Sequence, residues 1–323
     1  MKKLIFGILV LQALFASCEK SEVENDGQNP GGGSAGQISL TVTTYNVLKP
    51  DASARHRENM SMDKSEVRQA LASTIATTQS DIIGFGELDA THLSNGKYSL
   101  QKICSAIRDY TWSLEWPNSI SSNGSLSYSY SEGFAYNHKK LELLDKGYVW
   151  MSKTEDIFYE NPKPAYGKVG SPARTCVWTK FKHKETEKIF WVFVTHLPTK
   201  DQGGQENMAK VVNRFAQQKA GNDPAILIGD MNANPSSEAY ATLTSYWADG
   251  NNRNWGTMSG SSANYYYPTS TYSTGRPDRR IDHLMTRGCT AANYRTTIMT
   301  FKVGNEDWCP SDHLPVTATV TIK

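Results

Sequence analysis

Residues 225–232 read Ala-Ile-Leu-Ile-Gly-Asp-Met-Asn, and the fold class can be worked out from this stretch outward. Its apolar run predicts a strand that is buried in a sheet. Asp230 and Asn232 continue the side of the strand that carries Ile226 and Ile228, so the polar groups follow directly on the buried stripe. The stretch therefore predicts a core strand that delivers polar side chains to one end of a sheet.

Apolar alternation and helical periodicity take turns on both sides of this strand, which is typical of an α/β protein. Further strands are predicted over residues 38–46, 81–87, 133–137, 174–181, 188–196, 281–287 and 315–322. Helices are predicted over residues 63–78, 98–109, 205–220 and 237–246, the first with Asp63 and Glu66 at capping-box spacing. No internal repeat is evident, and residues 37–323 are expected to form one domain.

Three other predicted strands also end in a polar group on the side of an apolar stripe. These endings are Asn46 after Ile38, Leu40 and Val42; Glu87 after Ile83 and Phe85; and His196 after Phe190, Val192 and Val194. A single polar strand end usually marks only the point at which a strand reaches solvent. Together, however, these groups suit a hard divalent cation and proton transfer beside it. Because open α/β sheets commonly bind ligands at strand termini, a shared site is expected there.

Six short motifs follow one another along the chain. They are Thr44-Tyr45-Asn46, Asp81 to Glu87, Thr195-His196-Leu197, Gly229-Asp230-Met231-Asn232, Ile281-Asp282-His283 and Ser311-Asp312-His313. In this order they resemble the signatures of the endonuclease/exonuclease/phosphatase superfamily, relatives of deoxyribonuclease I. The resemblance implies a four-layer α/β sandwich, in which helices cover two central, mostly antiparallel β-sheets. It places the active site at one end of the sheets.

The resemblance also implies roles for the residues around a metal ion and a water molecule. Asn46 and Glu87 would bind Mg²⁺ or Mn²⁺, with Asp312 assisting, since oxygen ligands suit such a cation. Asp230 would orient the attacking water or accept its proton, while Asn232 would hold water or phosphate. Whether Asp230 or a histidine is the general base stays open.

The two histidines of the motifs receive different roles from the resemblance. His313 would contact the scissile phosphate, with Asp282 holding its imidazole and favouring the charged ring. His196 would help to protonate the leaving oxygen; abasic-site endonucleases carry Asn there, whereas deoxyribonuclease I, sphingomyelinases and many phosphatases carry His. Glu132 is a candidate support for His196, or else a surface carboxylate. Arg174 is a candidate phosphate contact, or else a solvated charge at a strand edge.

The start of the chain reads as an export signal. Lys2 and Lys3 precede an apolar run over residues 4–16, which is too short to span a bilayer, so residues 1–17 are expected to be a signal peptide. Cys18 follows Phe-Ala-Ser, which resembles a lipobox, and lipidation of Cys18 would anchor the mature chain in a membrane. The alternative is ordinary cleavage and a soluble secreted protein. Residues 18–36, acidic and rich in glycine, read as a flexible tether.

Charge limits the partners. The 34 basic and 32 acidic residues of the whole chain give +2, and removal of residues 1–17 takes two lysines away and leaves a neutral chain. A neutral chain does not coat nucleic acid non-specifically, although a nuclease with a few local phosphate contacts is not excluded.

The expected function is that of an exported, metal-dependent phosphoesterase, active as a monomer on a phosphomonoester or phosphodiester. As a lipoprotein, it would lie at the outer membrane or cell surface. The alternatives are a nuclease acting on extracellular DNA or RNA, a phospholipid phosphodiesterase acting on sphingomyelin or phosphoinositides, and, last, a non-catalytic binding protein. Among the cysteines, Cys104 and Cys176 are expected to be core thiols, and a disulfide between Cys289 and Cys309 is left open.

Overall fold

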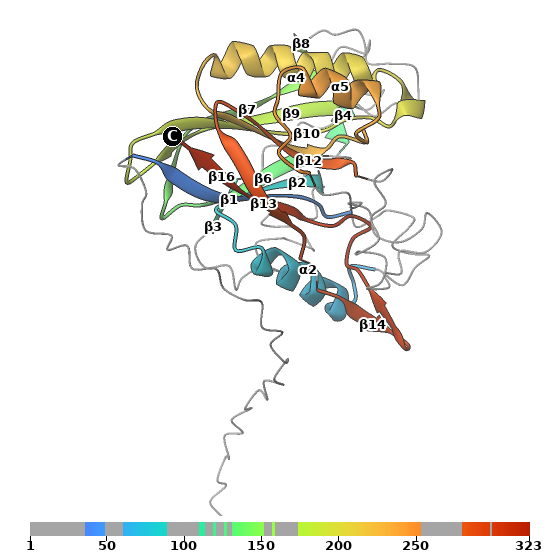
Figure 1. Cartoon of the computed structure of the whole chain (residues 1–323). Helices are drawn as coiled ribbons and strands as arrows, with labels where there is room; N and C mark the ends of the chain where they lie inside the picture. The colour runs from blue at the N-terminus through green and yellow to red at the C-terminus, as the bar shows by residue number, and fades with distance from the viewer. Residues whose placement is uncertain are drawn as a thin grey trace, which may run out of the picture. The chain divides into compact units, whose positions relative to one another are not determined.

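Two six-stranded β-sheets pack face to face, with helices on their outer sides (Figure 1). The first sheet has the order β13 (Thr290–Arg295), β16 (Val316–Ile322), β1 (Ile38–Asn46), β2 (Ile82–Leu88), β6 (Ser131–Asn137) and β3 (Tyr110–Ser113). The second has the order β12 (Asp282–Arg287), β11 (Ala225–Asp230), β10 (Ile189–His196), β9 (Arg174–His183), β7 (Leu141–Met151) and β8 (Ile157–Phe158). In each sheet one pair of strands is parallel, β1 with β2 and β10 with β11, and the other pairs are antiparallel.

The computed structural model describes residues 36–48, 61–88, 110–113, 119–120, 126–127, 131–151, 157–158, 174–252, 280–297 and 299–323. These residues belong to one compact unit, Ala35–Lys323. The predicted signal peptide, Cys18, nearly all of the predicted tether, the predicted helix over residues 98–109 and Cys104 lie outside the described residues. None of the helices in the described part of the chain is long and apolar enough to cross a membrane.

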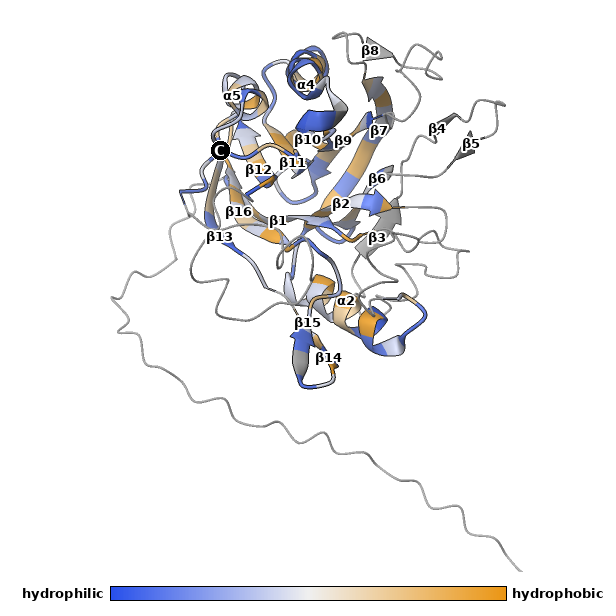
Figure 2. Ribbon diagram, turned by 90° about the vertical axis from the view of Figure 1, so that its right-hand side faces the viewer, coloured by the Kyte–Doolittle hydropathy of each residue, from blue (hydrophilic) through white to orange (hydrophobic). Residues whose placement is uncertain are grey.

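Three apolar clusters hold the layers together. Leu40 and Val42 of β1 pack between the sheets with Ile226 and Ile228 of β11. A second cluster lies between the second sheet and the helices α4 (Gln205–Ala220) and α5 (Glu238–Thr244), and a third lies between the first sheet and α2 (Ser65–Thr77). Figure 2 shows the apolar positions, in orange, gathered on the strands at the centre of the molecule. The predicted four-layer sandwich of two mostly antiparallel sheets is confirmed.

Close contact between the sheets depends on a glycine. A Cβ atom at Gly84 in β2 would lie 2.5 Å from the Cδ1 atom of Ile228 in β11. Because carbon atoms do not approach this closely, a larger residue at position 84 would require the side chain of Ile228 or the sheets themselves to shift. The spacing of the sheets, and with it the spacing of their strand ends, is therefore set partly by this residue.

Several local expectations differ from the structure. The residue before α2 is Lys64, and its side chain makes no capping hydrogen bond, so the predicted capping box of Asp63 and Glu66 is wrong. Strands β7 and β13 were not predicted, nor were the small hairpins of β14 (Phe301–Val303) with β15 (Glu306–Trp308) and of β4 (Ser119–Ile120) with β5 (Leu126–Ser127). Cys289 and Cys309 are not joined by a disulfide.

Candidate active site

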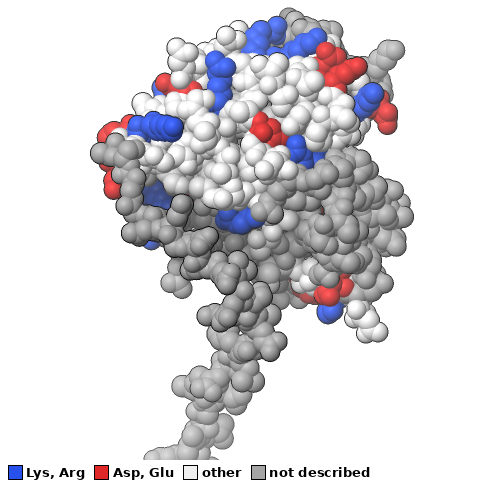
Figure 3. Space-filling view, in the orientation of Figure 1, with Lys and Arg blue, Asp and Glu red and all other residues white. Residues whose placement is uncertain are grey.

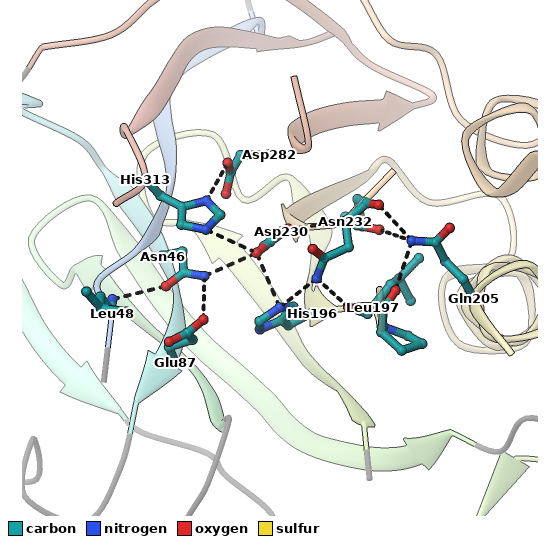
Figure 4. Close-up of polar contacts among 12 residues, drawn as sticks. Asn46, Leu48, Glu87, His196, Leu197, Gln205, Asp230, Asn232, Asp282 and His313 are labelled. Atoms are coloured by element: carbon teal, nitrogen blue, oxygen red, sulfur yellow. Dashed lines mark hydrogen bonds and ion pairs between the residues drawn. The ribbon is translucent and has the colours of Figure 1, made fainter. Parts of the chain in front are cut away.

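The polar strand ends meet because two β-α-β units face each other across the core. β1 and β2 are parallel and joined through α2, and Asn46 lies in register with Gly86. β10 and β11 are parallel and joined through α4, and His196 lies in register with Asp230. The carboxyl ends of both parallel pairs therefore lie at one end of the sandwich, where their side chains point toward one another (Figure 4).

Glu87 reaches the site by a local change in the backbone. Ile83 and Phe85, which share its parity along β2, pack beneath α2 and not between the sheets. The pairing of β2 with β6 shifts between Phe85 and Leu88, and Glu87 has a left-handed φ of 59°. Such a bulge redirects a side chain, and it turns Glu87 back toward Asn46. The expectation that Glu87 continues the buried face of Ile83 and Phe85 is therefore wrong, although Glu87 does reach the site.

Asp230 is the centre of the cluster. Its Oδ2 atom lies 3.1 Å from Asn46 Nδ2, 3.2 Å from His196 Nε2 and 3.6 Å from His313 Nε2. Its Oδ1 atom accepts a hydrogen bond from the backbone N–H of Asn232 at 2.9 Å. Burial raises the pKa of Asp230 to about 7, against the lowering effect of His313. A carboxyl group that titrates near neutrality can accept a proton from water and release it again.

His313 is held as a cation. Its Nδ1 atom lies 2.8 Å from Asp282 Oδ2, and both side chains are buried. Burial alone would lower the pKa of His313, but three carboxylates around it raise the pKa well above 6.5. They belong to Asp282, Asp230 and Asp312. The predicted pairing of His313 with Asp282 is present in the structure, and it gives a fixed positive charge that suits an anionic substrate.

His196 is a neutral ring in the same cluster. Burial lowers its pKa well below 6.5, and the positive charges of Arg174 and His313 add to this effect. Asn232 Nδ2 lies 3.0 Å from His196 Nε2 and donates to the carbonyl oxygen of Leu197 at 2.8 Å. A neutral imidazole can accept the amide N–H at Nε2. Without substrate, His196 is therefore not an imidazolium ion and has no extra proton to donate.

Arg174 and Glu132 lie inside the molecule, so the alternative that either is a surface charge is wrong. Arg174 is 2% exposed and Glu132 is fully buried. The carboxylate of Glu132 accepts a hydrogen bond from the hydroxyl of Thr175. Burial raises the pKa of Glu132 to about 8, while Thr175 and Arg174 act in the opposite direction. The predicted support of His196 by Glu132 stays a prediction.

The residues proposed to hold a cation can be tested on their donor chemistry. Asn46 Nδ2 donates to both Glu87 Oε1 and Asp230 Oδ2, at 3.1 Å each, and Asn46 Oδ1 accepts from the N–H of Leu48 at 3.0 Å. The amide nitrogen thus lies where two carboxylates converge. The amide oxygen of Asn46 and the carboxylate oxygens of Glu87 and Asp230 lie close to this point, and such oxygen atoms are the donors that a hard divalent cation takes. Asn46 and Glu87 therefore fit Mg²⁺ or Mn²⁺.

Asp312 lies at the edge of this group. It is partly exposed, and its neighbour Ser311 donates a hydrogen bond to the carbonyl oxygen of Asn46 at 2.7 Å. The loop that carries Asp312 is thereby tied to the end of β1. Glu87 and Asn232 are also partly exposed, so these three side chains line the side of the cluster that solvent reaches.

A second group of possible ligands fits a cation less well. Atoms of Asp230, Asp282 and His313 lie within 4.8 Å of one another, and all three residues are buried. An imidazole must lose its proton before it can bind a metal ion. Because the pKa of His313 is raised well above 6.5, the ring itself supplies the positive charge between the two carboxylates.

Two residues have supporting roles that were not assigned from the sequence, although Ser311 belongs to the Ser311-Asp312-His313 motif. Ser311 links the end of β1 to the loop of His313, because its hydroxyl also accepts the backbone N–H of His313 at 3.1 Å. Gln205 donates hydrogen bonds to the backbone that follows β10 and β11. Both bind backbone groups of other segments, and which segments these are depends on the complete fold.

Comparison with solved structures places this geometry among known proteins. The chain is similar to an endonuclease/exonuclease/phosphatase family protein from Bacteroides thetaiotaomicron, with 22% identity, a TM-score of 0.70 and coverage of 89% of this chain and 99% of that one. It is similar to the mannosyl-6-phosphatase of Bacteroides thetaiotaomicron, with 23% identity, a TM-score of 0.68 and coverage of 87% and 99%. A third family member, from Bacteroides vulgatus, has 19% identity, a TM-score of 0.64 and coverage of 88% and 100%. At these identities the likeness shows the fold.

The sequence itself also matches a known family. A comparison with curated proteins gave no match. The model of the endonuclease/exonuclease/phosphatase family matches residues 43–313, which is most of the chain and includes all the strand ends described above. This chain therefore belongs to the endonuclease/exonuclease/phosphatase family, whose members are phosphoester hydrolases.

Proposed function

We propose that this chain is a metal-dependent phosphoesterase that hydrolyses a small phosphate ester by attack of an activated water. The proposal rests on the groups around Asp230. This carboxylate, with a pKa of about 7, lies between a neutral His196 and a cationic His313. Such a set can take a proton from water while a fixed positive charge binds a phosphoryl oxygen.

Each residue of the site has its own role in the proposed reaction. Asp230 accepts the proton of the water, and Asn232 holds the water or the phosphate. His313, fixed by Asp282, stabilises the charge on the phosphoryl oxygens. Asn46 and Glu87, with Asp312, would hold Mg²⁺ or Mn²⁺, which as a Lewis acid supplies further positive charge for the phosphate.

His196 assists the leaving oxygen. A bound phosphate beside the ring would oppose the effects of burial and of Arg174 and would raise the pKa of His196. Proton uptake would then accompany substrate binding: the Nε2 atom of His196 would take up the proton in place of the Asn232 N–H, and it could deliver this proton to the leaving oxygen. Arg174, buried next to His196, supplies a further charge for the substrate.

A small ester fits this site better than a long nucleic acid. The mature chain predicted here is neutral, and on the face drawn in Figure 3 basic and acidic side chains of the described residues are scattered in small groups. Binding along a nucleic acid depends on several phosphate contacts. The mannosyl-6-phosphatase among the similar structures makes a sugar phosphate the first substrate to test.

We also propose that the protein is exported as a monomeric lipoprotein, anchored through Cys18 at the outer membrane or cell surface. The support for export and lipidation is the sequence of residues 1–18. Intact-mass measurement of the protein from the membrane fraction tests this part. A lipid adduct on Cys18 is expected, and a chain that begins at residue 18 without one would contradict it.

The activity is tested with p-nitrophenyl phosphate and bis(p-nitrophenyl) phosphate in the presence of Mg²⁺ or Mn²⁺. Hydrolysis of at least one ester is expected, with loss on addition of a chelator. His313→Gln should lower the rate by about 10² or more, because a charged phosphate contact is lost. The matched control is His183→Gln, at the end of β9, where the ring contacts Thr186. Equal rates for the two variants would contradict the assignment.

A further inference from the structure

Gln205 is the first residue of α4, and its side chain is almost fully buried, with 8% exposed. Its Nε2 atom donates hydrogen bonds to the carbonyl oxygens of Asn232 at 2.7 Å and Pro198 at 2.8 Å, and it lies 3.3 Å from that of Met231 (Figure 4). A primary amide has two N–H groups, so the two short bonds use both of them.

These carbonyl groups belong to the two segments that leave the site. One follows His196 at the end of β10, and the other follows Asp230 at the end of β11. The segments also contact each other directly, because the N–H of Leu197 donates to the carbonyl oxygen of Asp230 at 3.0 Å. Gln205 thus joins two loops from the side of the helix, directly behind the reacting groups.

Asn232 is the residue most dependent on this contact. It has a left-handed φ of 46°, a conformation that is uncommon outside glycine and is held here by its surroundings. Its N–H is bound to Asp230 Oδ1, and its carbonyl oxygen is bound to Gln205 Nε2. With both sides of the residue fixed, its side-chain amide is directed at His196 Nε2.

The packing of α4 does not depend on Gln205. The helix is anchored on the second sheet by the apolar side chains of Met208, Val212 and Phe215, all of which are buried. Asn213 joins it to the neighbouring segment, since its Nδ2 atom donates to the carbonyl oxygen of Thr242 at 2.7 Å and its Oδ1 atom accepts from Trp247 Nε1 at 3.0 Å. The Gln205 amide is therefore not needed to hold α4 on the sheet.

We propose that Gln205 is a positioning residue, which fixes Asn232 and His196 relative to each other for catalysis. The inference rests on the proposed phosphoesterase activity, in which His196 assists the leaving oxygen. Without the amide, Asn232 can leave its left-handed conformation and release the ring. An ester with a basic leaving group, such as a sugar alcohol, needs this assistance more than an aryl ester does.

The test compares two substitutions of similar volume in α4 that remove an amide, Gln205→Met and Asn213→Leu, in the full chain with Mg²⁺. Rates are measured for p-nitrophenyl phosphate and for a sugar 6-phosphate, or for the matching aryl and alkyl diesters if the wild type hydrolyses diesters. For Gln205→Met, the ratio of the alkyl rate to the aryl rate should fall by about tenfold, because small displacements of catalytic groups are costly. For Asn213→Leu, the ratio should equal that of the wild type.

The ratio is independent of the fraction of folded protein, so a merely structural role of Gln205 would leave it unchanged, and that result would overturn the inference. Gln205→Glu is the second variant, because it also removes both N–H donors at nearly constant shape. If neither variant folds while Asn213→Leu does, the inference is also overturned, since Gln205 is then required for the fold. A wild type that hydrolyses neither ester would instead refute the proposed function.

Discussion

The units β1–α2–β2 and β10–α4–β11 follow the same path, yet their strand ends differ in environment. The first unit ends in Asn46, which is 1% exposed, and in Glu87, which is partly exposed. The second ends in His196 and Asp230, each 3% exposed. Burial lowers the pKa of His196, so its ring is neutral at neutral pH, and raises the pKa of Asp230 to about 7, so this carboxyl group gains and loses its proton near neutral pH. The shared topology places the side chains, whereas their chemistry decides their use: the oxygen atoms of Asn46 and Glu87 suit a cation, and the titratable groups of His196 and Asp230 suit a proton.

The helices of the two units also differ in what they do for the site. α4 begins with Gln205, whose amide ties together the loops after β10 and β11. α2 begins with Ser65, whose hydroxyl donates to the adjacent Glu66 at 3.3 Å. The helix of the second unit thus contacts the loops that follow its own strand ends.

The largest effect is expected from a glycine in the second unit. Gly229 has a φ of 151°, and a Cβ atom there would lie 1.8 Å from the carbonyl oxygen of Thr195. Gly229→Ala should therefore separate β10 from β11 and remove the register of His196 with Asp230. We expect a loss of at least about 4 kcal/mol in the free energy of unfolding, as for the most disruptive substitutions, measured by urea denaturation.

The matching change in the first unit is Gly86→Ala, next to Asn46. The new Cβ atom would lie 3.6 Å from the nearest atoms of Asn46, which is an ordinary contact. A change of about 1 kcal/mol or less in the free energy of unfolding is expected. Equal losses in the free energy of unfolding for Gly229→Ala and Gly86→Ala would show that both strand pairs exclude a Cβ atom to the same degree, which would contradict the comparison.

A smaller effect is expected from Glu132, which lies beside the second unit. Its folded pKa of about 8 lies above its value of 4.5 without burial, so the stability it contributes is complete below pH 4.5 and is lost as pH rises through 8. Glu132→Gln removes this titration. Between pH 6 and 8, the free energy of unfolding should fall by about 2 kcal/mol more in the wild type than in the variant.

Glu142→Gln is the control, because Glu142 lies at the surface in an ion pair with Lys182. The pH dependence of its stability should match that of the wild type. If Glu132→Gln also keeps the wild-type pH dependence, Glu132 is ionised in the folded protein and the described burial does not raise its pKa.

The core strands could be predicted because they are nearly continuous apolar runs. β11 lies within the stretch of residues 225–232 that predicts a core strand, and α4 matches its predicted range of residues 205–220. β7 was missed because much of it is exposed, so charged residues interrupt its apolar pattern. The similarity of the two β-α-β units was missed because it lies in the backbone path and not in the sequence.

The site could be predicted in part for the same reason. His196, Asp230 and Asp282 lie on strand faces that continue inter-sheet stripes, and the structure brings them together as expected. Glu87 lies near Asn46 only because a bulge in β2 reverses the direction of its side chain, and strand periodicity cannot indicate such a bulge. Gln205 acts on backbone carbonyl groups whose positions depend on the complete fold.

The division of roles between the two units is tested most directly by a metal titration of Glu87→Gln and Asp230→Asn. Both substitutions keep the shape of the side chain and remove one charge. We expect Glu87→Gln to lose about 10² in rate at low Mg²⁺ and to recover most of it at high Mg²⁺ or Mn²⁺, because a weakened cation site can still be filled. Asp230→Asn should lose about 10³ at every metal concentration, because the lost group handles a proton. Recovery of Asp230→Asn with metal, or none for Glu87→Gln, would contradict the account.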